Sequence, residues 1–277
     1  MRVLMPLLLP LEGGGEESSW PPGVHSFDSR PLFPGVSPEW FNNHIAQAVI
    51  AAALVIGFWL FVAHNQKVVP GKRQFLGEWL YNVLRNSIAR DVLGHDYRRY
   101  LPYLVALFSF ILVNNLFGET FVFMFPTFSK IGFAWGLALC SFLLYNGAGI
   151  RKYGVGTYLK KMTLPPGVPW PLWPIIIPLE AISNFVVRPI TLGLRLFGNL
   201  FAGHLVVMVF VVGGTLLLTM SEPANGFPVP LLNAAGAVSI LFSFAIFAVE
   251  LLVAVLQAYI FTVLTAQYVA SAIAEEH

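Results

Sequence analysis

The sequence contains few charged residues. Of its 277 residues, 11% are charged and 57% are hydrophobic, whereas about 25% of the residues in an average soluble domain are charged. So few charges cannot cover the surface of a water-soluble globule, and we therefore expect the outer surface of the chain to face lipid. The net charge of +2 is also small, which argues against a nucleic-acid-binding surface.

Cysteine is nearly absent, and the sequence lacks the motifs of a membrane-embedded enzyme. The single cysteine, Cys140, excludes a disulfide within the chain. There is no HExxH motif for a zinc protease, and only one of the six histidines lies deep in an apolar run, whereas haem held by two histidines needs a pair. We therefore expect no catalytic activity of the chain itself, no cofactor and no metal.

Long apolar runs predict an all-α integral membrane protein with about five membrane helices. The expected spans are residues 44–64, 100–118, 131–150, 174–218 and 231–274. Over residues 74–93, apolar side chains recur every three or four positions, which predicts an amphipathic helix on the membrane surface. We expect residues 43–277 to form a single membrane domain.

The residues before the first span predict a water-exposed arm. Residues 12–40 are rich in Gly, Pro and Ser, and we assign the whole of residues 1–42 to an N-terminal arm outside the membrane. The first few residues are apolar, but Pro6 and Pro10 interrupt them and no Ala-x-Ala site follows. We therefore do not expect a cleaved signal peptide.

The last two apolar runs are too long for upright membrane helices. Each exceeds forty residues and would be about 65 Å long as one helix, whereas the hydrocarbon core of a bilayer is about 30 Å thick. Neither run has a charged loop in its middle, and Pro178 and Pro189 would kink the first run without reversing it. We therefore expect two long, steeply tilted helices that form an antiparallel hairpin.

The distribution of Lys and Arg predicts the orientation of the chain. Seven basic residues lie between the first two spans and four between the third and the fourth, whereas residues 118–130 contain one and residues 221–230 none. Cytoplasmic loops carry the excess of Lys and Arg. The N-terminus is therefore expected outside, and the C-terminus in the cytoplasm.

Polar and ionisable residues interrupt both long runs. The main ones are Glu180, Arg195, Asn199 and His204 in the first run and Glu250, Gln257 and Tyr268 in the second. An ionisable group at membrane depth costs about 2.5–3.5 kcal/mol on insertion scales, which favours a functional role. Arg195 lies near the middle of its run, too far from either end to reach the lipid headgroups.

These polar residues match in register. In an antiparallel hairpin, the numbers of facing residues add up to a constant. The pair His204 and Glu250 satisfies this rule within half a turn. So do Asn199 with Gln257, and Arg195 with the same glutamine. The pattern predicts a polar seam between the two helices, with titratable groups at several depths along which protons can move.

Three classes of function can be compared against such a seam. A secondary transporter or self-contained channel favours internal repeats and broken helices around a substrate at the midplane, and we find no repeat. A purely structural scaffold leaves the seam unexplained. A proton-translocating subunit explains Arg195. A cation in mid-membrane attracts a carboxylate of a partner protein and lowers the pKa of that carboxylate, so that the partner releases its proton there.

At these residues the sequence resembles a known family. The stretches PITLGLRLFGNLFAGH and LLVAVLQAYIFTVLTAQYV, with the terminal EEH, resemble subunit a of the F-type ATP synthases. The resemblance extends from about residue 30 to the end and is strongest over residues 174–277. Members of this family form the stationary membrane part of a proton-driven rotor, so the resemblance implies a proton-carrying subunit that is not itself the catalyst.

The resemblance also implies a role for each polar residue. Arg195 matches the essential arginine of the family, and Asn199 and Gln257 match its polar neighbours. His204 and Glu250 match the ionisable pair of the half-channel open to the outside. Their order is that of mitochondrial members, whereas many bacterial members have the acid first.

Three further positions follow from the same resemblance. Glu180 and Tyr268 match the half-channel open to the cytoplasm. Several members have an aspartate where Gly118 stands, and Glu119 is expected to take its place in the outer path. The implied partners are the c-subunit ring, the b-subunit peripheral stalk, the remaining F-type ATP synthase subunits and lipid. The implied location is the bacterial plasma (inner) membrane, with the mitochondrial inner membrane as the alternative.

Overall fold

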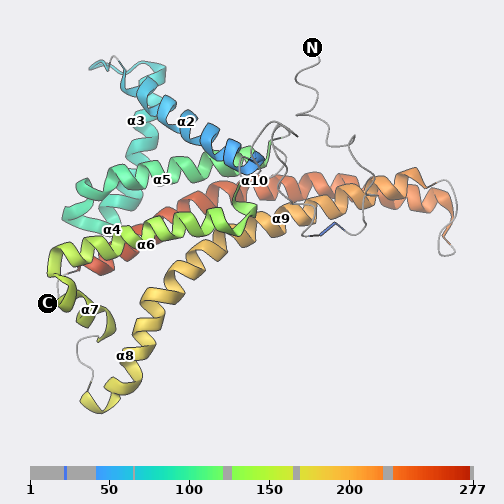
Figure 1. The fold of residues 1–277 in the computed structure, drawn as a ribbon. Helices are drawn as coiled ribbons and strands as arrows, with labels where there is room; N and C mark the ends of the chain where they lie inside the picture. The colour runs from blue at the N-terminus through green and yellow to red at the C-terminus, as the bar shows by residue number, and fades with distance from the viewer. Residues whose placement is uncertain are drawn as a thin grey trace. The chain divides into compact units, whose positions relative to one another are not determined.

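The computed structural model describes residues 22–23, 42–64, 66–120, 127–164, 169–220 and 227–274, so nearly all of the expected N-terminal arm lies outside the described residues. The described part is all-α, as predicted, and contains five helices long and apolar enough to cross a membrane. The main helices are α2 (Asn43–Ala63), α3 (Lys72–Leu84), α5 (Tyr97–Gly118), α6 (Ile131–Tyr153), α7 (Val155–Thr163), α8 (Trp173–Ile182), α9 (Arg188–Thr219) and α10 (Val229–Ile273) (Figure 1). The shorter elements are η2 (Arg85–Arg90), α4 (Asp91–Leu93), η3 (Gly94–Asp96), η4 (Thr127–Ser129), η5 (Trp170–Leu172) and η6 (Ser183–Val187).

The chain divides into two compact units. Unit 1 consists of Met1–Ala51, Leu112–Lys130 and Gly198–Leu256, and unit 2 of Ala52–Ile111, Ile131–Phe197 and Gln257–His277. The divisions fall within α2, α5, α9 and α10, so each unit holds a part of these four helices. Of the predicted site residues, Glu119, Asn199, His204 and Glu250 belong to unit 1, and Glu180, Arg195, Gln257 and Tyr268 to unit 2.

In unit 2, the predicted amphipathic segment leads directly into the second membrane helix. Helical structure runs from Lys72 to Leu93 through α3, η2 and α4, close to the predicted 74–93. Gly94 then adopts a φ of 57°, a conformation that residues with a side chain rarely adopt. The chain can therefore change direction there before α5 begins. Phe75 and Trp79 are exposed, as expected of a helix whose apolar face meets lipid or another protein.

The long run 170–219 contains a π-helical turn between α8 and α9. In η6, the backbone N–H of Arg188 bonds to the carbonyl of Ser183, five residues earlier. The next N–H of this pattern would belong to residue 189, which is a proline and has none. The carbonyl of Asn184 therefore lacks its helical donor, and the Tyr145 hydroxyl donates a hydrogen bond to it instead, at 3.1 Å. Pro189 thus changes the helix without reversing it, as predicted.

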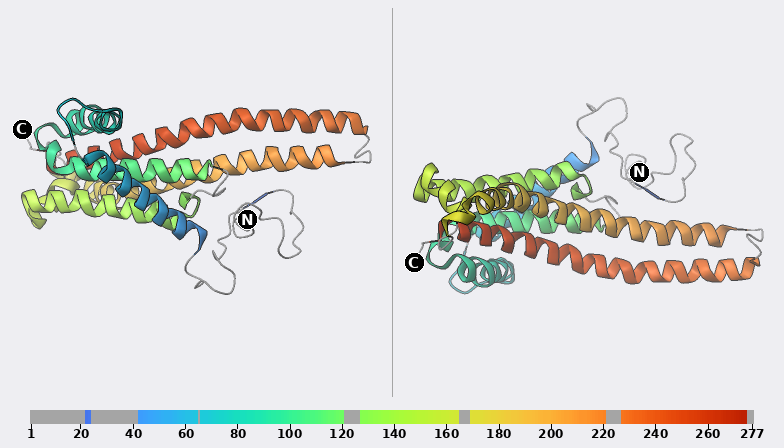
Figure 2. Two further views of the ribbon diagram at one scale, coloured as in Figure 1. Left: turned by 90° about the horizontal axis from the view of Figure 1, so that it is seen from above. Right: turned by 90° about the horizontal axis from the view of Figure 1, so that it is seen from below.

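In unit 1, α9 and α10 form the predicted antiparallel pair. Both views of Figure 2 show the second part of α9 and the first part of α10 side by side. The Ser239 hydroxyl donates to the carbonyl of Phe210 at 2.8 Å. Gly214 and Gly236 lie against each other, and a Cβ on Gly236 would be 2.7 Å from the Gly214 carbonyl oxygen. The numbers of these contacting residues add up to nearly one value, as the antiparallel register requires.

The glycine contact predicts a loss of stability on substitution. Gly236→Ala forces a methyl group against the backbone of α9, and overpacking of this kind costs about 1–3 kcal/mol. We expect this variant to unfold at a lower temperature than the wild type, measured by thermal unfolding of the detergent-solubilised protein. Gly198→Ala is the matched control, since no atom lies within 4 Å of its Cβ position. Equal thermal stability of the two variants would contradict the prediction.

In unit 2, the end of α10 is held by residues of α6 and α7. Lys152 Nζ donates to the carbonyl of Ile273 at 2.9 Å, and the Tyr153 hydroxyl donates to that of Ala274 at 2.6 Å. Lys161 also donates to the Ala274 carbonyl. The last carbonyls of a helix have no partner within it and carry partial negative charge. These cations and the hydroxyl therefore stabilise the end of the helix that carries Tyr268.

Candidate functional site

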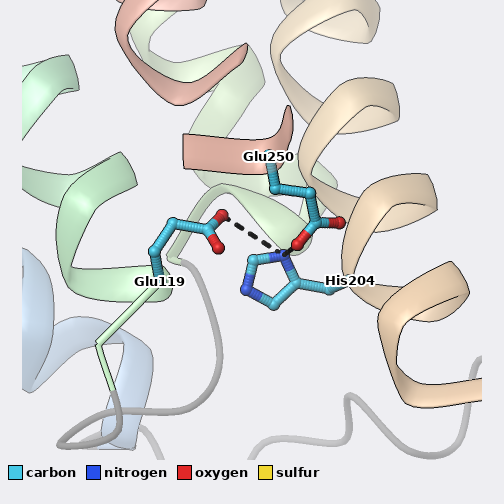
Figure 3. A group of neighbouring side chains, drawn as sticks. All are labelled: Glu119, His204 and Glu250. Carbon is cyan, nitrogen blue, oxygen red and sulfur yellow. Dashed lines mark ion pairs between the residues drawn. The ribbon is translucent and has the colours of Figure 1, made fainter. Parts of the chain in front are cut away.

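Three ionisable side chains of unit 1 converge on one point. Glu119 follows the last residue of α5, His204 lies on α9 and Glu250 on α10. The Nδ1 atom of His204 is 3.7 Å from a carboxylate oxygen of Glu119 and 3.9 Å from one of Glu250. Figure 3 shows both carboxylates pointing toward this ring nitrogen. The predicted pair of His204 and Glu250 is therefore in contact, and Glu119 joins it.

The backbone determines which nitrogen of His204 carries hydrogen. The Nε2 atom lies 3.0 Å from the carbonyl oxygen of Gly118. A carbonyl only accepts hydrogen bonds, so Nε2 is the N–H donor, and in the neutral ring Nδ1 presents a lone pair. Nδ1 has no hydrogen-bond partner among the described residues. His204 is thus oriented to accept a proton at the atom that faces the two carboxylates.

The carboxylates are held where little water reaches them. Glu119 and Glu250 are 8% and 9% exposed. Burial raises the pKa of Glu119 above its usual range, and the neighbouring His204 and Glu250 partly oppose this rise. Glu119 therefore holds a proton more readily than a carboxyl in water.

Polar contacts fix the end of α5 on which Glu119 depends. The Asn115 side-chain amide donates to the carbonyl of Ala254 on α10, at 3.0 Å. Gln47 on α2 donates to the carbonyl of Asn114 at 3.4 Å. Both asparagines are buried, so these bonds are shielded from competing water. The segment VNNLFGET thus positions Glu119 through its asparagines as well as through its helix.

Glycine makes room for Glu250. A Cβ on Gly203 would collide with a carboxylate oxygen of Glu250. A larger residue before His204 would displace this carboxylate from its position against α9. The ligand-type atoms of Glu119, His204 and Glu250 all lie within 4.8 Å of one another, close enough to share a cation.

A second polar network lies in unit 2, around Glu180. The Asn184 side-chain amide donates to a carboxylate oxygen of Glu180 at 3.2 Å and to the carbonyl of Met162 at 2.6 Å. Asn184 is buried, and its backbone carbonyl accepts the hydrogen bond from the Tyr145 hydroxyl. The sequence pointed to Glu180 but not to Asn184 or Tyr145 as members of a site. Pro189 was the available signal, since it leaves a carbonyl without a donor.

Tyr268 joins this network through aromatic contacts. Its ring centroid is 5.7 Å from that of Tyr145, at an edge-on angle of 62°. The guanidinium of Arg188 lies over the ring of Tyr268, 5.2 Å from its centroid, a favourable cation–π arrangement. Glu180 and Tyr268, predicted to act together, are therefore linked through Asn184 and Tyr145. Arg188 is a further cation of this network and was not among the predicted site residues.

The three central residues differ in their surroundings. Arg195 is exposed, and among the residues that the structure describes it forms no hydrogen bond or ion pair. Asn199 is exposed as well, whereas Gln257 is 1% exposed. Asn199 and Gln257 belong to different units, so their predicted proximity stays a prediction. An exposed arginine on an apolar helix requires a partner that this part of the chain does not supply.

Comparison with known proteins agrees with these observations. Residues 45–270 match the family model described as ATP synthase A chain. The chain is 42% identical over 266 residues to "ATP synthase subunit a" of a Nocardioides species, covering 93% of this chain and 94% of the relative. It is 40% identical over 276 residues to the protein of that name from Pseudarthrobacter chlorophenolicus, covering 99% and 100%. A relative from Acidiphilium cryptum is 37% identical over 237 residues, covering 84% and 88%. The chain therefore belongs to the ATP synthase A chain family.

Proposed function

We propose that this chain is the stationary subunit of the membrane sector of an F-type ATP synthase and carries protons to and from a rotating ring of c subunits. Two polar networks, one around His204 and one around Glu180, serve as offset half-channels. The observation that carries the proposal is Arg195, an exposed cation without a partner in the described chain, placed between these networks in the sequence. Its natural partner is a carboxylate on the ring.

The outer half-channel uses the cluster of unit 1. A proton from outside reaches Glu119, Glu250 and His204. The carboxylates of the two glutamates each have an oxygen within 4 Å of the Nδ1 atom of His204. Small rotations of these side chains bring the acid and the base within hydrogen-bond reach, where they exchange a proton. The proton then passes to a ring carboxylate near Asn199 and Gln257. The neutral carboxyl can turn through lipid, because it carries no charge into the hydrocarbon.

Arg195 separates the two half-channels. Its guanidinium stays charged at any ordinary pH, so it lowers the pKa of a ring carboxylate beside it and favours release of the proton. The same charge repels protons that would cross directly from one half-channel to the other. Proton flow then requires rotation of the ring.

The inner half-channel receives the released proton in unit 2. Glu180 accepts it, and Tyr268, Tyr145 and Asn184 line the way to the cytoplasm. The cation of Arg188 over the Tyr268 ring holds this tyrosine in place. Each elementary charge that crosses the membrane contributes about 2.3 kcal/mol per 100 mV to rotation.

The orientation and partners follow from the same proposal. The N-terminus lies outside and the C-terminus in the cytoplasm of a bacterium, with the chain in the plasma membrane. The long pair of α9 and α10 is tilted, since α10 with 45 residues is about 68 Å long. The b-subunit peripheral stalk holds the chain against the ring. The chain needs no cofactor of its own for this role.

Cysteine labelling from each side of the membrane tests the two half-channels. Cys140 is first replaced by serine, which gives a background without cysteine. Single cysteines are then placed at positions 204, 250, 180 and 268, and oriented vesicles are treated with a membrane-impermeant thiol reagent. We expect reagent outside to label 204 and 250 only, and reagent inside to label 180 and 268 only. Labelling of 180 and 250 from the same side would replace the rotor proposal by a continuous pore.

A further inference from the structure

We propose that Arg85, Tyr97 and Arg98 bind the phosphate group of an anionic lipid headgroup at the membrane surface. All three belong to unit 2, where Arg85 begins η2 and the other two residues begin α5. The binding site rests on their geometry and does not depend on proton movement through the chain. Only its assignment to the cytoplasmic leaflet rests on the proposed orientation.

Two guanidinium groups converge on one neutral oxygen. The Nη2 atom of Arg85 donates to the Tyr97 hydroxyl oxygen at 3.5 Å, and the Nε atom of Arg98 donates to the same oxygen at 3.3 Å. Both groups also lie over the Tyr97 ring, each 5.9 Å from its centroid. Two positive charges that approach one point repel each other, and an anion placed between them removes this repulsion.

No acidic side chain of the described chain neutralises this pair. Neither Arg85 nor Arg98 forms an ion pair among the residues that the structure describes. Asp91 and Asp96 are the acidic residues of the same segment, and both are exposed and unpaired with these arginines. Glu78 accepts a hydrogen bond from Gln74 instead, at 2.6 Å. The converging charges are therefore available to an anion from outside the chain.

A phosphate group suits the donors that meet here. Arginine presents a planar fork of N–H groups, which matches the oxygens of phosphate. The Tyr97 hydroxyl oxygen accepts from both arginines, so its own hydrogen is free to donate to a third phosphate oxygen. The N-terminal end of α5, at the same place, adds partial positive charge.

The position of the site indicates a lipid rather than a dissolved ion. The expected span 100–118 begins directly after the two arginines of α5, which places them at the level of the headgroups. The helix that leads into η2 is α3, and its Phe75 and Trp79 are 61% and 55% exposed. Aromatic residues of this kind are enriched at the interface of membrane and water. Anionic lipids of the cytoplasmic leaflet attract arginines at this depth.

Quenching of a fluorophore by a brominated lipid tests the site in the assembled complex. All variants carry Cys140→Ser, and His95→Cys attaches the fluorophore at an exposed position two residues before Tyr97, in a complex otherwise free of cysteine. Vesicles of phosphatidylcholine contain increasing amounts of brominated phosphatidylglycerol or, as the neutral reference, brominated phosphatidylcholine. We expect half-maximal quenching at an at least about tenfold smaller mole fraction of the anionic lipid. Equal mole fractions would contradict the proposal.

Two double variants of equal net charge separate the site from the overall charge. Arg85→Gln with Arg98→Gln removes both converging groups, and we expect the lipid preference to fall about tenfold or more. Arg99→Gln with Arg151→Gln removes the same charge from exposed arginines outside the site and should keep the preference. Arg99 is a close match because it is adjacent in sequence but lies over the ring of Tyr100. Equal preferences of the two double variants would overturn the proposal.

The variant Tyr97→Phe is a milder test, in which both positive charges remain. It removes the hydroxyl on which the two guanidinium groups converge. We expect the preference for the anionic lipid to fall by roughly threefold, the effect of one lost hydrogen bond. A preference equal to that of the parent would show that the convergence on Tyr97 does not form the site.

Two competitors distinguish the lipid from other anions. An excess of inorganic phosphate at constant ionic strength should leave quenching by brominated phosphatidylglycerol unchanged, because a free anion lacks the acyl chains that hold the lipid beside α3 and α5. Displacement by phosphate would replace the lipid by a dissolved ion. Loss of the peripheral stalk from the variant without Arg85 and Arg98, with no lipid preference in the parent, would assign both arginines to an acidic protein segment and overturn the lipid site.

Discussion

Replacement of Arg195 by alanine is expected to reduce ATP-driven proton pumping in membrane vesicles to below about 1% of the wild-type rate. Removal of one preorganised charge that stabilises a developing charge typically costs about 10²–10³ in rate. Arg195 is exposed and forms no hydrogen bond or ion pair among the described residues, so its guanidinium is available to a ring carboxylate. The measurement is acidification of inverted vesicles, followed with a pH-sensitive dye.

Two further variants determine what Arg195 contributes. Arg195→Lys keeps a positive charge but loses the planar, permanently ionised fork, and we expect it to fail nearly as badly as alanine. Arg151→Ala removes an exposed arginine at the end of α6 and should pump at close to the wild-type rate. Normal acidification by Arg195→Ala would refute the central role of this residue.

The pair of His204 and Glu250 is expected to behave as a unit. Either single replacement by alanine should slow proton pumping by roughly a hundredfold, since a positioned acid or base contributes about 10²–10⁴ to a proton transfer. The exchange His204→Glu with Glu250→His restores an acid and a base in contact, 3.9 Å apart in the parent. We therefore expect the double variant to pump at least about tenfold faster than His204→Glu or Glu250→His alone.

A double-mutant cycle on the pumping rate measures this coupling. Residues in contact have non-additive effects, whereas independent residues add. Glu119 lies 3.7 Å from the same nitrogen in the parent, so the cycle is measured with Glu119 unchanged. Additive losses with no recovery in the exchanged variant would show that the two side chains do not act together.

The sequence by itself determined the class of fold and the order of the helices. Long apolar runs and few charges are sufficient for this prediction. Lipid requires every span to be apolar and to satisfy its backbone hydrogen bonds internally, which in an apolar run of this length means a helix. The antiparallel register of α9 and α10 could also be predicted from the sequence, since polar residues in apolar membrane helices tend to face one another. The contact of His204 with Glu250 confirms that reading.

Only the tertiary structure decided how these residues are joined. The bond from His204 to the Gly118 carbonyl, which leaves Nδ1 facing two carboxylates, connects positions 86 residues apart through a backbone atom, and no sequence pattern marks it. The link from Glu180 through Asn184 to Tyr145 likewise depends on a carbonyl that Pro189 deprives of its donor. Periodicity records which helix face a side chain occupies. It does not record which backbone groups of a distant segment lie opposite that face, because this depends on how the helices pack.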